Sequence, residues 1–128
     1  MSLGRVGFKD LEVWKESKKL AVEVYKETNK PGFLKDGSLR DQIRRAAVSI
    51  PSNIAEGDER GSNREAVRFF YIAKGSIAEL ITQLEIANEI GYICDDVLRD
   101  LIEKCETIGK KLGSLINVRS KANNQKNP

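Results

Sequence analysis

The stretch Ser38–Gly57 reads SLRDQIRRAAVSIPSNIAEG, and its spacing decides the fold. Apolar residues recur along it at steps of three and four, the spacing of one buried helical face: Leu39, Ile43, Ala46, Ala47, Ile50 and Ile54. Polar residues recur at the same spacing beside that face: Gln42, Arg45, Ser49, Asn53 and Glu56. A periodic polar stripe of this kind predicts side chains that meet specific partners.

Capping and breaking residues set the expected ends of this helix. Ser38 is the expected N-cap, with Asp41 completing a weak capping box. Pro51 removes one backbone hydrogen bond, so it either kinks the helix or ends it early. The apolar spacing continues through Ile54, which favours a kink and predicts a helix over 38–57.

Three further segments have helical periodicity. The expected helices are 10–29, with Asp10 as N-cap, 62–91, with a Ser62–Glu65 capping box and Gly91 as C-cap, and 96–117. The segment NKPGFLKDG at 29–37 is rich in Pro, Gly, Asn and Asp and is expected to be a loop.

Four amphipathic helices with short connections predict an all-α fold, an up-down-up-down antiparallel four-helix bundle. We expect residues 1–9 to form a flexible leader, residues 10–118 the bundle, and residues 119–128 a disordered basic tail. No second domain or internal repeat is indicated.

A second polar stripe, Ser76, Glu79 and Gln83, lies beside the apolar face of 62–91. In an antiparallel pair with 38–57, one register places Gln42 opposite Gln83, Arg45 opposite Glu79 and Ser49 opposite Ser76. We call the two stripes together the polar seam: Gln42, Arg45, Ser49, Asn53, Glu56, Ser76, Glu79 and Gln83. The seam either fixes the helix register, as buried polar groups can, or continues to an exposed end and binds something.

Composition excludes several kinds of chemistry. The 128-residue chain contains no histidine, which removes His-based acid–base catalysis and His-ligated metal sites. Cys94 and Cys105 form no CxxC pair, and we expect them to be buried small apolar residues rather than a disulfide. We therefore expect no enzyme, no cofactor and no metal. No apolar run is long enough to span a bilayer and no signal peptide is evident, so no membrane partner is expected.

A formal net charge of +3 permits nucleic-acid binding without requiring it. The cations available for phosphate contacts fall in three groups: Arg44, Arg60 and Arg64; Lys110 and Lys111; and Arg119, Lys121 and Lys126 in the tail. Most aromatic residues lie on the expected core stripes, so contacts to RNA or DNA should be led by phosphate rather than by base stacking.

Three quoted runs carry a family resemblance: FKDLEVWKESKKLAVEVY from Phe8, LRDQIRRAAVSIPSNIAEG from Leu39, and GSIAELITQLEIANEIGYI from Gly75. Together they resemble the four-helix-bundle proteins of the 23S rRNA-intervening sequence protein family, over roughly residues 8 to 116. The resemblance implies a four-helix bundle, a homo-oligomer expected to be a pentamer, the bacterial cytoplasm, and a link to ribosomal RNA.

Two functions from different classes follow. In the first, the oligomer binds nucleic acid, with a ring of copies multiplying a modest charge. In the second, it is a protein-interaction scaffold whose polar seam meets a partner or a neighbouring subunit. Self-association is also expected because the apolar side of 11–28 is wider than three bundle neighbours need.

Overall fold

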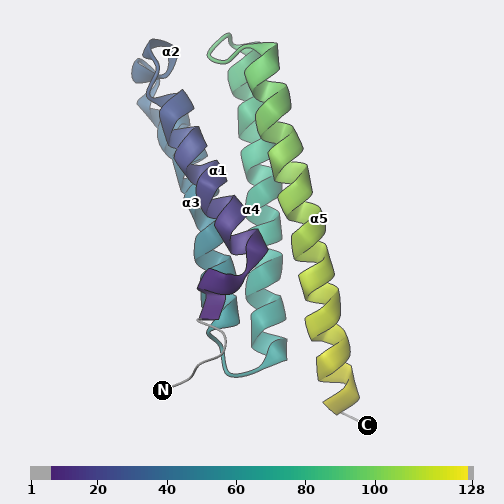
Figure 1. Cartoon of the computed structure of the whole chain (residues 1–128). Coiled ribbons are helices and arrows are strands. Elements are labelled where there is room, and N and C mark those ends of the chain that lie inside the picture. The colour runs from purple at the N-terminus through teal and green to yellow at the C-terminus, as the bar shows by residue number, and fades with distance from the viewer. Residues whose placement is uncertain (1–6, 127–128) are drawn as a thin grey trace.

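The structure is a computed structural model that describes the backbone of residues 7–126 and the side chains of residues 7–122. It contains a short 3-10 turn, η1 (Gly7–Asp10), four long helices and one short one (Figure 1). The long helices are α1 (Glu12–Thr28), α3 (Gly37–Asp58), α4 (Asn63–Glu89) and α5 (Asp95–Lys126), and the short one is α2 (Pro31–Leu34).

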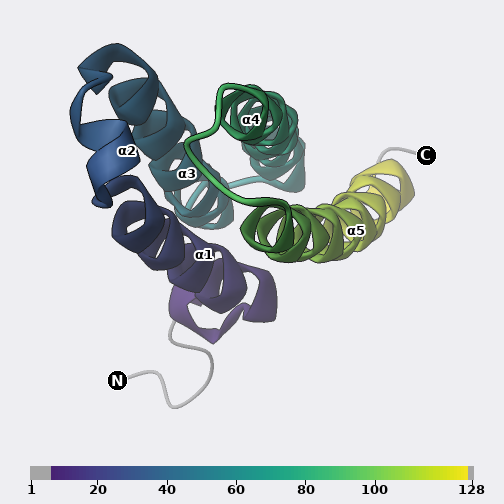
Figure 2. The ribbon, with the colours of Figure 1, turned by 90° about the horizontal axis from the view of Figure 1, so that it is seen from above.

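The four long helices run alternately up and down, as the sequence predicts. Seen from above, α1, α3, α4 and α5 follow one another around a ring, with α1 and α4 on the diagonal (Figure 2). The α3–α4 pair is the most extensively packed and the α1–α5 pair the least. The expected all-α antiparallel bundle is therefore confirmed. Its least extensive helix–helix packing is between the first and last long helices, α1 and α5.

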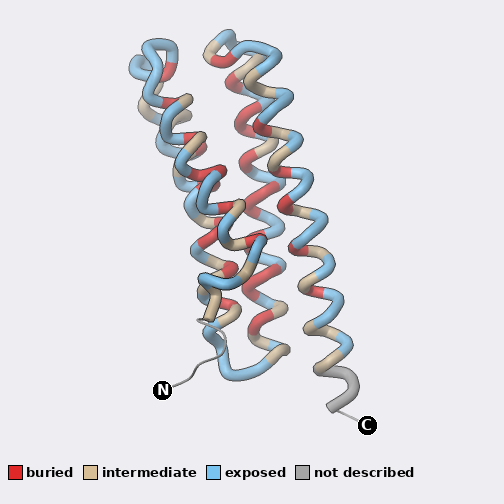
Figure 3. The backbone as a smooth tube through the Cα atoms, viewed as in Figure 1, coloured by how far each residue is buried: buried red, intermediate tan, exposed pale blue. Residues whose placement is uncertain are grey.

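The apolar stripes read from the sequence form the core (Figure 3). On α3, Ile43, Ala47, Ile50 and Ile54 are fully buried. The predicted stripe of α4 is buried over its whole length: Ala66, Phe69, Ala73, Ile77, Leu80, Leu84 and Ala87. Burial of apolar surface on this scale is the main source of stability for such a bundle.

The connection between α1 and α3 differs from the expected loop. Residues Pro31–Leu34 form a single helical turn, because Pro31 suits the first position of a helix and Phe33 is fully buried. The N-cap of α3 is Asp36, whose carboxylate accepts from the Leu39 N–H at 3.1 Å, so the prediction of Ser38 is wrong. Asp36 also accepts a hydrogen bond from the Tyr92 hydroxyl at 3.0 Å, which ties this corner to the α4–α5 connection.

Beyond the other end of α3, the predicted N-cap of α4 is confirmed. Ser62 accepts from the Glu65 N–H at 3.2 Å and begins α4. The helix α3 passes through Pro51, which is buried, and ends only at Asp58. Gly91, with φ of +90°, follows the last residues of α4 in the left-handed conformation that favours glycine.

The N-terminal boundary of the bundle differs slightly from the prediction. The first α-helix begins after Leu11, not at an Asp10 cap, because Asp10 belongs to η1. Phe8, in the same turn, lies edge-on against Trp14 with ring centroids 5.1 Å apart. The predicted flexible leader therefore has a structured end at Gly7–Lys9, and its residues 1–6 lie outside the described part of the chain.

The C-terminal boundary is a larger correction. The last helix continues to Lys126, about nine residues beyond its expected end near 117, so a disordered segment over 119–126 is wrong. Two features account for the extension. No Gly or Pro occurs between Ile116 and Lys126, and Arg119 is held by contacts with the α3–α4 turn. The remaining residues, 127 and 128, lie outside the described part.

Most exposed apolar side chains do not lie on α1, contrary to the expected wide interface there. Its apolar residues Val13, Leu20, Ala21 and Val24 are buried within the bundle, and only Val22 and Tyr25 are exposed. The α3–α4 pair carries more of them, Val48 on α3 and Ile72, Ile86 and Ile90 on or just after α4. Of the two cysteines, both free, Cys105 is buried as expected but Cys94 is exposed.

Candidate nucleic-acid interface

One pair of residues in the polar seam forms a hydrogen bond between α3 and α4. The Ser49 and Ser76 hydroxyl oxygens are 2.8 Å apart, which confirms the predicted pairing. Ser76 donates its only hydroxyl proton to the Ile72 carbonyl at 3.2 Å, so the Ser76 oxygen accepts the hydrogen bond that the Ser49 hydroxyl donates. Asn53 donates to the Ser49 hydroxyl at 2.9 Å and to the Ser49 carbonyl at 2.8 Å. The link thus has a defined donor order and fixes helix register.

The other two predicted pairings are not formed. Gln42 donates to Ser38 at 3.4 Å on its own helix, and Gln83 is buried, with its side-chain oxygen unbonded among the described residues. Arg45 and Glu79 are both exposed, and no ion pair joins them in the described part of the chain. A surface ion pair contributes little free energy, so the fold does not depend on this contact. Glu56 pairs instead with Arg60, at 2.7 Å.

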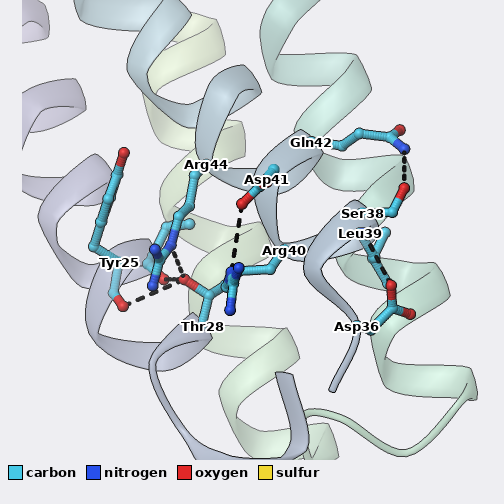
Figure 4. A network of polar contacts seen from close by, with 10 residues as sticks. Tyr25, Thr28, Asp36, Ser38, Leu39, Arg40, Asp41, Gln42 and Arg44 are labelled. Atoms are coloured by element: carbon cyan, nitrogen blue, oxygen red, sulfur yellow. Dashed lines mark hydrogen bonds and ion pairs between the residues drawn. The ribbon is translucent and has the colours of Figure 1, made fainter. Parts of the chain in front are cut away.

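Arg44 lies between α1 and α3 and is held in place from two sides (Figure 4). Its Nε donates to the Thr28 hydroxyl at 2.8 Å, and its guanidinium lies 4.5 Å from the centre of the Tyr25 ring. The groove beside it also contains the carboxylate of Asp41. Sixteen residues of chain separate Arg44 from Arg60, or about 24 Å of helix. The structure therefore does not bring Arg44 together with the other predicted cations.

The arginines near the α3–α4 turn are mostly neutralised. Arg60 pairs with Glu56 and lies 4.5 Å from the centre of the Phe69 ring. Arg119 pairs with Asp58 at 2.5 Å. Arg64 is exposed and forms no ion pair within the described part of the chain. An arginine that is already paired has little to gain from a phosphate, so this end offers few available charges.

The predicted lysines of α5 also differ in whether a carboxylate already pairs with them. Lys111 forms an ion pair with Glu16 of α1. Lys110, one residue earlier, points to the other side of α5 and has no ion-pair partner among the described residues. Lys121 is exposed, and the side chain of Lys126 lies outside the described part. Lys110 is therefore the best-placed of the predicted cations.

Lys110 lines a groove between α4 and the second half of α5, which we call the basic groove. The groove has a volume of about 720 Å³. Its second cation is Lys74 of α4, which also has no ion-pair partner in the described part. None of the eight residues that line it is acidic: Tyr71, Lys74, Lys110, Gly113, Ser114, Ile116, Asn117 and Ser120. Its α4 residues lie in the first half of that helix, and its α5 residues follow from the middle of that helix onward.

Four other grooves along the bundle each contain carboxylates, which separates them from the basic groove. The upper part of the α4–α5 seam, for example, is lined by Glu85, Asp95, Glu103 and Glu106. In the α1–α5 groove, Lys104 is 2.6 Å from Glu23 and 2.9 Å from Asp100, and hydrogen bonds to these two carboxylates raise the pKa of Lys104. Of these five grooves, the basic groove alone is lined by cations and by no carboxylate, so it presents the least electrostatic repulsion to a polyanion.

Sequence reasoning missed Lys74 and Tyr71. Both lie on the part of α4 that faces away from its core stripe, and Tyr71 is 56% exposed. The available signal was their three-residue spacing outside that stripe, which places them on one side of the helix. Their proximity to Lys110 depends on how α4 and α5 pack, which the sequence pattern alone does not specify.

Other kinds of site find no support in the described residues. No group of three or more Cys, Asp or Glu side chains among them is arranged to hold a metal ion. None of the helices in that part of the chain combines the length and apolar character that a membrane crossing needs.

The fold and the groove together define an antiparallel helical-bundle protein with a basic groove that no carboxylate lines. Residues 9–114 match the 23S rRNA-intervening sequence proteins, and the chain belongs to that family. It is also similar to a crystal structure of a protein of unknown function from the S23 ribosomal protein family of Bacteroides thetaiotaomicron. The two share 27% identity with a TM-score of 0.74, over 81% of this chain and 97% of the other. No functionally curated protein matches the chain.

Proposed function

We propose that this protein is a non-enzymatic, oligomeric nucleic-acid-binding protein of the bacterial cytoplasm that holds RNA phosphates in the basic groove. One observation carries the proposal: Lys74 and Lys110 line the same groove, neither has an ion-pair partner among the described residues, and no carboxylate lines it. Phosphate contacts from free lysines release counterions, which is the main source of sequence-independent affinity. The family to which the chain belongs, named for 23S rRNA, favours RNA as the ligand.

A salt series tests this proposal. Binding of a labelled RNA and of the matching DNA to the full chain is measured by fluorescence anisotropy. Affinity should fall steeply with salt, and the double variant Lys74→Ala/Lys110→Ala should bind more weakly with a shallower salt dependence, by about 0.7 in slope for each lost phosphate contact. The matched control is Lys19→Ala/Lys26→Ala, which removes the same charge from grooves that contain acids. Equal losses in both variants, or no binding at low salt, would overturn the proposal.

Oligomerisation belongs to the same proposal, since several copies would place several basic grooves on one particle and bind RNA by avidity. The exposed apolar side chains Val48, Ile72, Ile86 and Ile90 make the outer face of the α3–α4 pair a candidate surface for contact between copies. We expect light scattering to give a multiple of the 14.3 kDa chain mass, with five copies as the expected number from the family resemblance. Ile72→Asp should reduce that mass, and Val22→Asp, on the exposed side of α1, should not.

The alternative function, a protein-interaction scaffold, uses the same outer face. It is favoured by Gln83, whose buried side-chain oxygen has no hydrogen-bond partner in the described part of the chain and lies on the α4 stripe that also carries Ile86 and Ile90. If the assembled protein binds no nucleic acid at low salt, a protein partner at this face becomes the better assignment.

A further inference from the structure

Tyr71 is the one aromatic side chain that lines the basic groove. It is 56% exposed, and within the described part of the chain no ring or cation is stacked on it. The other strongly exposed tyrosine, Tyr25, differs in this respect because the Arg44 guanidinium lies 4.5 Å from its ring centre. Tyr71 therefore offers a ring available for stacking beside two lysines that are available for phosphates.

This combination distinguishes single-stranded from double-stranded nucleic acid. In a duplex the bases are stacked on one another and only phosphates and groove edges are accessible, so a tyrosine ring gains nothing. In a single strand a base can turn out and stack on an aromatic side chain while the backbone follows a basic channel, and every base has a face that can stack.

The remaining lining of the groove suits a single strand as well. Ser114, Asn117 and Ser120 follow one another at steps of three along α5 and supply hydroxyl and amide groups without charge. From Lys110 to Ser120 the groove follows about 15 Å of helix. Toward the start of α5 it gives way to the acidic groove of Glu103 and Glu106, which limits the bound segment to a few nucleotides per copy.

We propose that the basic groove is a single-strand binding site, in which Lys74 and Lys110 hold phosphates and Tyr71 stacks on one base. This inference rests on the proposed nucleic-acid function and makes it more specific. It predicts little dependence on base identity, since stacking and phosphate contacts are common to all nucleotides.

The experiment compares two probes on the full chain: a labelled RNA of about 12 nucleotides without self-complementarity, within the usual footprint of single-strand binders, and the same RNA annealed to its complement. Wild type should prefer the single strand. Tyr71→Leu should weaken single-strand binding about tenfold and leave duplex binding unchanged, whereas Tyr71→Phe should bind as wild type does. Tyr25→Leu is the matched control, an exposed tyrosine outside the groove, and should change neither affinity.

The outcomes separate the two proposals. Equal affinity for single strand and duplex, or wild-type single-strand affinity in Tyr71→Leu, would overturn the stacking site while leaving phosphate binding by the lysines in place. Absence of binding to both probes at low salt would instead overturn the nucleic-acid function itself. The variants should keep the thermal midpoint of wild type, because Tyr71 and Tyr25 are both exposed. A loss of affinity with an unchanged midpoint then arises in the groove and not from unfolding.

Discussion

Arg119 of α5 donates to the carboxylate of Asp58, the last residue of α3, at 2.5 Å. The Asp58 side chain is 1% exposed and that of Arg119 is 19% exposed, so this is an ion pair largely shielded from water. Arg119 also donates to Asn63 at 3.4 Å, and its guanidinium lies 5.6 Å from the centre of the Phe70 ring. Through this one side chain, the late turns of α5 are attached to the turn between α3 and α4.

We expect Arg119→Ala to lower the free energy of unfolding by about 2 kcal/mol, because hydrogen bonds to charged groups in shielded positions contribute on that scale. Urea denaturation followed by circular dichroism measures the change. The control is Arg99→Ala, which removes an arginine paired with Asp96 at 3.0 Å, where the side chains are 71% and 89% exposed. That variant should show no measurable change. Similar losses in both would contradict the importance of shielding.

The Ser49–Ser76 link should show coupling in a double-mutant cycle. Ser49→Ala and Ser76→Ala should each cost about 1 kcal/mol, and the double variant less than their sum, because the two side chains share a hydrogen bond. The Arg45→Ala and Glu79→Ala pair should be additive, since no ion pair joins those exposed residues within the described part of the chain. The same denaturation measurement gives both cycles, and a coupled Arg45–Glu79 pair would show that the two side chains meet in solution.

Much of the fold could be predicted because it depends on local periodicity. The apolar stripes of Ile43–Ile54 and Ala66–Ala87 are read directly from spacing, and both are buried. Caps were less reliable, since Asp36 and Ser38 are both good N-cap residues and only the position of the chain decides between them. The end of α5 was missed because its stabilising contact, Arg119 with Asp58, joins residues 61 positions apart in sequence.

The candidate site was less predictable, for a related reason. Whether a lysine is available for a ligand depends on neighbours that come from other helices. Lys110 and Lys111 are adjacent in sequence, yet Lys111 pairs with Glu16 of α1 while Lys110 faces the basic groove. Tyr71 and Lys74 became relevant only once α4 and α5 were packed together. Helical spacing gives the face on which a residue lies, but not the charge of the surface opposite.

The two cysteines should react very differently with a thiol reagent. Cys94 is exposed and should be modified quickly in the native protein, whereas Cys105 is buried and should react only after unfolding. Burial raises the pKa of the Cys105 thiol to about 12. Mass spectrometry after brief alkylation should therefore find one modified thiol per native chain and two per denatured chain. Rapid modification of Cys105 in native protein would show that the core opens there.

The Cys105 thiol also contributes to the pH dependence of the free energy of unfolding. The folded pKa is raised above the unfolded value of about 9, so at alkaline pH the unfolded chain releases a proton that the folded chain retains. The stability contributed by the buried, protonated thiol is therefore fully present below about pH 9 and is lost as the pH rises toward 12. The stability of wild type should therefore fall more over this range than that of Cys105→Ala. Parallel stability curves for the two proteins would contradict the raised pKa.

Gly57 is required by the close approach of α3 to the start of α4. A Cβ at this position would lie 2.9 Å from Phe69 Cβ, 2.9 Å from Phe70 Cε1 and 3.0 Å from the Ala66 carbonyl oxygen. Two of these three are a backbone oxygen and a Cβ, which cannot move without moving the helix. We expect Gly57→Ala to destabilise the protein by about 1–3 kcal/mol through overpacking, even though alanine is the better helix former.

The control is Gly109→Ala on α5, where nothing lies within 4 Å of the added Cβ. That substitution should stabilise the protein by about 0.5–1 kcal/mol, so thermal denaturation should show shifts of opposite sign. Two shifts of the same sign would mean that helix propensity, and not the contact between α3 and α4, determines which residue is tolerated at Gly57.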